Sequence, residues 1–455
     1  MKKALSMVLT GALAISLAAC GGSGTGENTE SKTANKDESS VAESKTDSAS
    51  GTHENVTLRF YNYALSETAK ADWWKSMIDT FEKENSWIDI ETITVDYNSM
   101  IQTFTNDLAS GLSVDLIYGE VNWVPALADG GFIQCPKDVL DQDFYSGYYD
   151  YVLKQMEYNG EVYAVPHYYS PSLIFVNKQL VEAAGLSMSD FPTTLDGLKE
   201  WIETLGDFYK DDTNVTTIFG LATSEVSATG SNINAIYNAF GGTLINDDGT
   251  LADLSSGTNK TAMSETLDFY KYLVSNGYTQ ENLKLKDYRA SFGAGNVIMY
   301  VDQSWGYAQI AEVADNTADF TVTAPLPVTM GTNGKGASLV ESHCFLIGAG
   351  LSDAQKEAVD LFLQYCTQTS TMEDYLNNIG VAFVAHEGME NCKMSPILDG
   401  ASAQIDNVIS QHQIAAITSV QTELASMVLN YIQNDISPED AINSYVAEAE
   451  YYINQ

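Results

Sequence analysis

The 455-residue sequence has few basic residues, and this scarcity excludes a class of partners. Its 22 lysines and arginines are outnumbered by 61 acidic residues, so the net charge is −39 at pH 7. Nucleic-acid phosphates and anionic lipid headgroups repel such a chain, and we therefore expect no nucleic-acid partner. With 44% hydrophobic residues the chain can still form packed cores, and its length predicts two or three domains.

Cysteine is also scarce. Apart from Cys20 near the N-terminus, the chain contains Cys135, Cys344, Cys366 and Cys392, which show neither metal-site spacing nor the density of a disulfide scaffold. Their even number permits disulfides in an exported protein, whereas their sparse apolar surroundings favour buried free thiols, and both alternatives stay open. The five histidines are scattered as well, so we expect neither a metal ion nor a cofactor.

Long hydrophobic runs are missing except at the N-terminus, where Lys2 and Lys3 precede an apolar stretch from Ala4 to Ala19. This stretch is too short for a permanent membrane span and predicts a secretory signal peptide over residues 1–19. It ends in Leu17-Ala18-Ala19-Cys20, which resembles the lipobox of bacterial lipoproteins. We therefore expect a lipid on Cys20; the alternative is an ordinary cleavable signal with an incidental cysteine.

Aromatic residues are absent from residues 21 to 55, which are rich in Ser, Thr, Gly and charged residues. Such a segment cannot bury enough apolar area to offset the entropy of ordering. We predict that residues 20–55 form a disordered tether between the lipidated cysteine and the globular part.

The globular part begins with a strand pattern. Apolar residues alternate over Val56–Phe60 and again over Ile88–Ile90, and a third strand is predicted over Val114–Tyr118. Helical spacing separates these strands, so the order is βαβαβ. This order predicts an α/β fold with a parallel sheet, and ligands of such sheets bind at the carboxyl ends of the strands.

Apolar residues at helical spacing and capping residues predict several helices. Between the strands the stripes consist of Trp74, Met77, Ile78 and Phe81, and of Ile101, Phe104 and Leu108. Two capping boxes are predicted, from Ser99 to Gln102 and from Ser352 to Gln355. Further helices are predicted over Lys260–Asn276 and from Ser437 onward.

Catalytic motifs are missing: the sequence has no GxSxG, HExxH or Walker A motif. We therefore expect that the protein is not an enzyme. Carboxylates are abundant, however, and a pair of them across a cleft could hydrolyse a glycosidic bond. A glycan-hydrolysing surface lipoprotein is the alternative from a different functional class.

Aromatic residues gather in segments predicted to be loops after strands. Flat rings pack against the C–H faces of sugars, so this pattern favours a carbohydrate ligand, although each ring taken alone also fits ordinary core packing. The residues concerned are Tyr61, Tyr63, Tyr118, Trp123, Tyr168, Tyr169 and Trp305.

Several ordered motifs across residues 56 to 455 resemble the extracellular solute-binding proteins of ATP-binding-cassette importers, in the sugar-binding group that includes maltose-binding protein. The motifs are Phe81-Glu82-Lys83-Glu84, Ala109-Ser110-Gly111 before Val114-Asp115-Leu116-Ile117, Leu127-Ala128-Asp129-Gly130-Gly131-Phe132-Ile133, Tyr158-Asn159-Gly160-Glu161-Val162-Tyr163-Ala164-Val165-Pro166, Asn177-Lys178-Gln179-Leu180 with Ala184-Gly185-Leu186, and Phe292-Gly293-Ala294-Gly295-Asn296.

This resemblance implies a two-lobed periplasmic-binding-protein-like fold with a ligand cleft between the lobes. One lobe takes residues 56–164 and 328–382, and the other takes residues 165–327 and 383–455. It also implies that Trp305, in Asp302-Gln303-Ser304-Trp305, stacks on a sugar. Cleft loops carry the remaining candidate site residues, which are Asn122, Trp123, Tyr63, Tyr169, Ser231 and Asn232.

The function implied by the resemblance is capture of a sugar or oligosaccharide and its delivery to the permease of an ATP-binding-cassette importer. We expect a monomer, held by its lipid on the outer side of the cell membrane or facing the periplasm. Within the same fold a peptide, a polyamine or a metal chelate is an alternative ligand. The strong acidity makes a cationic ligand worth testing.

Overall fold

The computed structural model describes residues 53–141, 143–389, 392 and 394–455. The predicted signal peptide, the lipidated Cys20 and the tether as far as residue 52 lie outside the described residues. At the start of the described chain, the ring of His53 stacks on Trp87 with 4.4 Å between ring centres.

The predicted βαβαβ order is confirmed. Strand β1 (Val56–Asn62) leads through α1 (Thr68–Glu84) to β2 (Ile88–Ile93), and α2 (Met100–Ala109) leads to β3 (Leu116–Glu120). Strand β1 lies between β2 and β3 and pairs with both in parallel, which places the carboxyl ends of the three strands at one edge of the sheet. The third strand begins and ends two residues later than predicted.

Two details predicted for α2 are wrong. The Ser99 side chain makes no capping hydrogen bond, because Ser99 already has helical backbone angles, with φ −100° and ψ −4°. The stripe consists of Met100, Phe104 and the partly buried Leu108, so the prediction is correct for Phe104 and Leu108, whereas Ile101 is 39% exposed. Residues four apart share a helix face, so a stripe that starts at Met100 turns Ile101 toward solvent.

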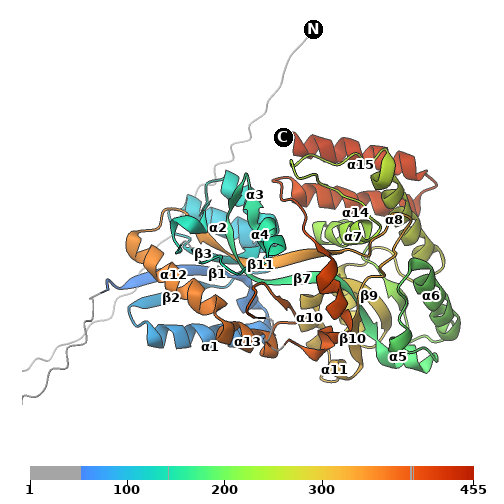
Figure 1. Cartoon of the computed structure of the whole chain (residues 1–455), viewed down its shortest axis with the longest axis horizontal. Helices are drawn as coiled ribbons and strands as arrows, with labels where there is room; N and C mark the ends of the chain where they lie inside the picture. The colour runs from blue at the N-terminus through green and yellow to red at the C-terminus, as the bar shows by residue number, and fades with distance from the viewer. Residues whose placement is uncertain (1–52, 142, 390–391, 393) are drawn as a thin grey trace, which may run out of the picture. The chain divides into compact units, whose positions relative to one another are not determined.

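Two long strands, β7 (Ala164–Asn177) and β11 (Ser338–Gly348), run through the middle of the molecule (Figure 1). They pair antiparallel within a sheet of order β2-β1-β3-β11-β7-β9-β8, in which β8 is Thr217–Gly220 and β9 is Val297–Gln303. Helices α1, α12 and α13 lie on one side of this pair in the view, and α5, α6, α14 and α15 on the other.

The pairing of β7 with β11 contains an irregularity. His343 pairs with Tyr168 and the next residue, Cys344, pairs with Pro166, which leaves His167 as an extra residue in β7. Such a β-bulge re-aims the side chains around it. Tyr168 and Tyr169 therefore lie inside a strand, and their predicted placement in a loop is wrong.

Two more aromatic residues predicted to lie in loops belong instead to strands. Tyr61 lies in β1 and Tyr118 in β3, and both rings are buried. Tyr63 and Trp123 do follow their strands, in 3-10 turns. The prediction therefore holds for the residues that come after a strand and fails for those that lie within one.

The remaining strands are short, and helices supply most of the other buried faces. The short strands are β4 (Ile133–Gln134), β5 (Glu157–Tyr158), β6 (Glu161–Val162), β10 (Thr321–Ala324), β12 (Phe383–Val384) and β13 (Val408–Ile409). The helices are α3 (Val124–Asp129), α4 (Asp150–Met156), α5 (Lys178–Ala183), α6 (Leu195–Tyr209), α7 (Ser227–Ala239), α8 (Gly257–Ser275), α9 (Leu285–Gly293), α10 (Tyr307–Ala311), α11 (Thr317–Phe320), α12 (Asp353–Thr367), α13 (Thr369–Asn378), α14 (Ile417–Gln433) and α15 (Pro438–Ile453).

The later helix predictions are confirmed. Ser352 and Gln355 form the predicted capping box of α12, and the Ser437 side chain accepts a hydrogen bond from the backbone of Asp440 at the start of α15. Helix α8 begins three residues before the predicted start and ends one residue before the predicted end. Cys135, Cys344, Cys366 and Cys392 are free thiols, which decides between the two cysteine alternatives.

Two hydrophobic cores form around the central strands. The first core contains side chains of β1, β2, β3, α1 and α12, such as Phe60, Trp74 and Phe362. The second core contains side chains of α6, α7, α8 and α14, such as Ile236 and Val428. Among the described residues, no helix combines the length and the apolar character that a membrane span requires.

Candidate functional site

Aromatic side chains gather where three strands end. The 3-10 turns η1 (Tyr63–Ser66), η3 (Val121–Trp123) and η6 (Ser304–Gly306) directly follow β1, β3 and β9. Each turn carries one candidate ring, namely Tyr63, Trp123 and Trp305. Strand β9 runs opposite to β1 and β3. Its last residue, Gln303, pairs with Ser172 of β7, whereas the last residue of β3, Glu120, pairs with His343 opposite Tyr168 of β7, so the turns meet near the middle of β7.

His343 lies at the centre of this region. The hydroxyl oxygens of Tyr63 and Tyr168 lie 2.6 Å and 2.7 Å from its Nδ1 atom, and its Nε2 atom lies 3.2 Å from Oε1 of Glu120. The Trp305 ring centre is 5.6 Å from the imidazole centre. One buried imidazole therefore joins side chains from η1, β3, β7, β11 and η6.

Glu120, the last residue of β3, is held from two sides. Its Oε2 accepts a 2.6 Å hydrogen bond from Tyr97, and its Oε1 faces His343. Burial opposes ionisation, but the hydrogen bonds from His343 and Tyr97 together with the charge of His343 outweigh it and lower the pKa of Glu120. The Tyr97 ring lies 5.5 Å from Trp123, so the carboxylate is placed beside aromatic rings.

A second carboxylate, Glu341, lies two residues before His343 on β11. Its Oε1 accepts a hydrogen bond from Ser231 of α7, which joins the second core to this region. Burial and the negative charge of Glu120 raise the pKa of Glu341 to about 7. At neutral pH, Glu341 therefore exchanges readily between its protonated and its ionised form.

Trp305 rests on a buried ion pair. The guanidinium carbon of Arg289 lies 4.4 Å from the Trp305 ring centre, within the range of a cation–π contact. Arg289 in turn binds both carboxylate oxygens of Asp302, at 2.7 Å and 2.8 Å. Burial opposes the Arg289 charge, but the charge of Asp302 and the hydrogen bonds to it outweigh burial and raise the pKa of Arg289. The pair fixes the ring in place.

The structure brings four of the predicted side chains into this region, Trp305, Tyr63, Trp123 and Ser231, with Asp302 beneath them. Tyr169 lies on the opposite face of β7, where its ring packs against Tyr151 and Phe383 at 5.3 Å and 5.6 Å. This follows from strand geometry, because successive side chains point to opposite faces.

The two predicted asparagines differ in their surroundings. Asn232 is buried in α7 and donates a hydrogen bond to the carbonyl of Val301 at 3.2 Å, so its amide nitrogen faces β9. Asn122 is half-buried in η3, one residue before Trp123. Of the two asparagines, Asn122 is the more exposed to solvent.

Sequence reasoning missed Glu120, Glu341, His343 and Arg289. A signal for the first three was present. Glu341 and His343 interrupt the otherwise apolar strand pattern of β11 at alternate positions, and Glu120 ends a strand whose carboxyl end was expected to face a ligand. Arg289 had no such signal, because its partner Asp302 lies on a different element.

The chemistry of this region suits a polyhydroxylated ligand. Rings supply flat apolar contact, and the carboxylates, the imidazole and the tyrosine hydroxyls supply hydrogen-bond partners around them. The Nε1–H group of Trp305 is buried and makes no hydrogen bond to any described residue. Within the described residues, no three His, Cys, Asp or Glu side chains are grouped as metal ligands.

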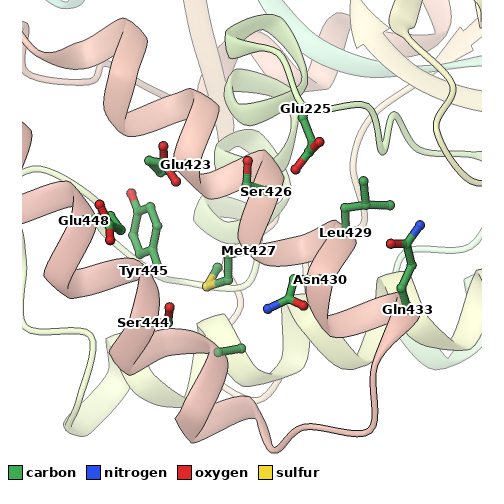
Figure 2. Close-up of a pocket in the computed structure, with 11 residues that line it drawn as sticks. Glu225, Glu423, Ser426, Met427, Leu429, Asn430, Gln433, Ser444, Tyr445 and Glu448 are labelled. Atoms are coloured by element: carbon green, nitrogen blue, oxygen red, sulfur yellow. The ribbon is translucent and has the colours of Figure 1, made fainter.

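A hollow of about 380 Å³ lies elsewhere, between α14, α15 and the segment before α7. Figure 2 shows the carboxylates of Glu225, Glu423 and Glu448 projecting from three separate segments around it. None of the predicted site residues lines this hollow. It is a polar depression between helices and lies apart from the ring cluster.

Comparison with known proteins identifies the family. Residues 76–387 match the family of bacterial extracellular solute-binding proteins. The chain belongs to this family. It is 26% identical over 333 residues to the mannitol-binding protein of Pseudomonas aeruginosa, covering 67% of this chain and 68% of that protein. It is 23% identical over 371 residues to a binding protein of Brucella abortus, covering 80% of this chain and 84% of the relative.

Solved structures share the fold of this solute-binding protein. One is a solute-binding protein of an ABC transporter from Thermotoga lettingae bound with alpha-D-tagatose, with a TM-score of 0.72, 19% identity and coverage of 88% of this chain and 100% of that chain. Another is the cyclic alpha-maltosyl-1,6-maltose binding protein from Arthrobacter globiformis, with a TM-score of 0.72, 18% identity and coverage of 88% and 99%. The predicted two-lobed α/β fold is thereby confirmed.

Proposed function

We propose that this solute-binding protein captures a sugar or oligosaccharide beside Trp305 and His343, between its two lobes, and delivers it to the permease of an ATP-binding-cassette importer. The observation that carries the proposal is the joining of aromatic rings from three strand ends with hydrogen-bonding side chains at one buried imidazole. Rings and polar groups in this arrangement match the two kinds of surface that a pyranose presents.

The lobes proposed for this function are residues 56–164 with 328–382, and residues 165–327 with 383–455. Strands β7 and β11 link them, and Ser231 of α7 meets Glu341 of β11 at their junction. A ligand held between the lobes favours the closed state only through contacts that it makes in that state and lacks in the open one. Side chains from both lobes at one site supply such contacts.

The experiment that tests sugar binding is a thermal unfolding screen of the purified protein against a carbohydrate library. A ligand at 100 times its dissociation constant stabilises the folded protein by about 2.7 kcal/mol. We expect a rise in the melting temperature with one group of related sugars. A library without any stabilising sugar would contradict the proposal.

We further propose that the protein binds its ligand without turning it over. The relatives named above are binding proteins, which supports this view. Incubation with a labelled oligosaccharide that binds should return the oligosaccharide intact at one equivalent per protein. Products accumulating beyond one equivalent would instead support the hydrolase, with Glu120 and Glu341 as its candidate carboxylate pair.

We also propose that a lipid on Cys20 holds this protein, as a monomer, at the outer side of the cell membrane. The support is the sequence Leu17-Ala18-Ala19-Cys20 ahead of a polar segment. A single acyl chain anchors only marginally, so stable attachment needs the two chains of a diacylglyceryl group. Cys20→Ala should move the protein from the membrane fraction to the soluble fraction. Full retention of the variant in membranes would refute lipidation as the anchor.

A further inference from the structure

The side chains around His343 carry more negative than positive charge. Asp302 and Arg289 neutralise each other through two hydrogen bonds. Glu120 is paired only with His343, and Glu341 forms no ion pair with any described residue. Even a protonated His343 therefore leaves one half-buried carboxylate without a counter-charge among the described residues. An unpaired carboxylate in such a place is costly and favours either a proton or a cation as its partner.

The charged and titratable groups around the two carboxylates come from several elements and offer no spare cation. The groups that face them are Tyr63, Tyr97, Tyr168, His343, Asp302 and Arg289. Among the described lysines, Lys70 is buried, and it forms its own ion pair with Glu67 at 2.7 Å. The described protein therefore supplies no further basic side chain to Glu341.

The geometry places the two carboxylates on one face of the sheet. Glu341 and His343 are two residues apart on β11, so they share one face of the strand at a spacing of about 7 Å. Glu120 pairs directly with His343 across the sheet and lies on that same face. Oε1 of Glu341 accepts from Ser231, whereas Oε2 has no partner among the described residues. That free oxygen can accept a further hydrogen bond.

We propose that the sugar this site takes is an amino sugar, with its ammonium group between Glu120 and Glu341 and its ring against Trp305. An ammonium group brings three N–H donors and one positive charge, which match the free acceptor and the missing counter-charge. A neutral sugar hydroxyl supplies a hydrogen bond but no charge. This inference rests on the proposed function, because it names the ligand class of the same site.

A proton is the competitor of the ammonium group. Burial and the charge of Glu120 raise the pKa of Glu341 to about 7, so below this pH Glu341 becomes neutral and no longer attracts a cation. Binding of an amino sugar should therefore displace protons from the protein and should weaken as the pH falls from 7 to 5. The affinity for neutral sugars should stay constant or rise as the pH falls from 7 to 5, because these sugars do not displace the proton.

The experiment is isothermal titration calorimetry at pH 7 with matched sugar pairs. The probes are glucosamine against glucose, galactosamine against galactose, and the β-1,4-linked glucosamine disaccharide against cellobiose, with the N-acetylated sugars as neutral controls. We expect at least one amino sugar to bind about 10-fold or more tightly than its hydroxyl counterpart. Repeating the titration in buffers of different ionisation enthalpy should reveal proton release.

Glu341→Gln separates the local charge from the net charge of the protein. Glutamine keeps an acceptor for Ser231 and removes only the negative charge, so the variant should fold and should lose the 10-fold preference for the amine. Glu423→Gln removes one negative charge in the hollow between α14 and α15 and should keep the preference. Equal loss in both variants would assign the preference to the overall charge and overturn the inference.

The outcomes distinguish this inference from the proposed function. Sugars that bind without a preference for the amine overturn the amino-sugar inference and leave sugar binding standing. Failure of every sugar, neutral or amino, contradicts both. Spermidine that binds as tightly as the amino sugar, with no effect of Trp305→Ala on either, would indicate a receptor for cations in general and would also overturn the inference.

Discussion

Two acidic regions of this solute-binding protein differ in what surrounds their carboxylates. Glu120 and Glu341 lie on strands of the central sheet, among rings, an imidazole and a serine hydroxyl from other elements. Glu225, Glu423 and Glu448 line a hollow between helices, where the first and last are exposed to solvent. Acidity alone is thus a poor guide to function, and the partners that a carboxylate has on separate elements are the informative property.

Among the variants considered, removal of a buried charge should have the largest effect on the free energy of unfolding. Arg289→Ala leaves Asp302 buried without its two-bond partner, and we expect a loss of about 3 to 5 kcal/mol in the free energy of unfolding. Lys154→Ala is the matched control, because its pair with Asp247 is exposed, and it should cost about 0 to 1 kcal/mol. Denaturant unfolding of both variants measures the difference, and similar losses would contradict it.

Removing the ring above that ion pair should affect binding more than folding. Trp305→Ala loses apolar contact with the ligand, so affinity for the best sugar should fall by about 2 to 4 kcal/mol, or roughly 30- to 1000-fold. Trp201→Ala truncates a partly buried tryptophan that packs on Phe191 in the second core and should leave affinity unchanged. A Trp305→Ala variant with wild-type affinity would show that this ring packs within the protein and does not contact the ligand.

The pH dependence of stability should distinguish the two acidic regions next. The folded pKa of Glu341, about 7, lies above the ordinary value of 4.5. The stabilisation from its protonated form is therefore fully present below pH 4.5 and is lost as the pH rises to 7. Relative to wild type, Glu341→Gln should gain up to about 3 kcal/mol between pH 4.5 and pH 8. Unfolding curves that run parallel across this range would argue against an uncompensated carboxylate.

The smallest effect is expected in the hollow. Glu423→Gln removes a carboxylate of the same charge from a solvent-facing depression, and the free energy of unfolding should stay within about 0.5 kcal/mol of wild type. The same denaturation series at pH 4.5 and pH 8 provides the measurement. A pH-dependent change as large as that of Glu341→Gln would erase the contrast between the regions.

Local sequence patterns predicted much of the fold. The alternation at Val56–Phe60 and the stripe from Trp74 to Phe81 depend on neighbouring residues only, and both were confirmed. The capping box at Ser352 was confirmed and the one at Ser99 was wrong, because the chain approaches α2 already in a helical conformation. A motif of four residues cannot report the path of the chain that precedes it.

The site was predicted less completely, since it is assembled from distant segments. Trp305 was expected from the resemblance, but its support by Arg289 depends on the packing of α9 against β9. Tyr169 was expected in a cleft loop, yet it lies inside β7, where strand alternation sends its ring and that of Tyr168 to opposite faces. Knowing that β7 continues through both tyrosines would have separated them.

The position of β7 has a consequence for how the molecule melts. Along this strand Leu173 and Phe175 belong to the first core, while Ile174 and Val176 belong to the second. If either core unfolds, β7 loses the side-chain contacts on one of its faces, although the other core still packs on its opposite face. The two cores are therefore coupled in unfolding, and the cooperative unit should be the whole globular chain, with a single calorimetric peak even without ligand.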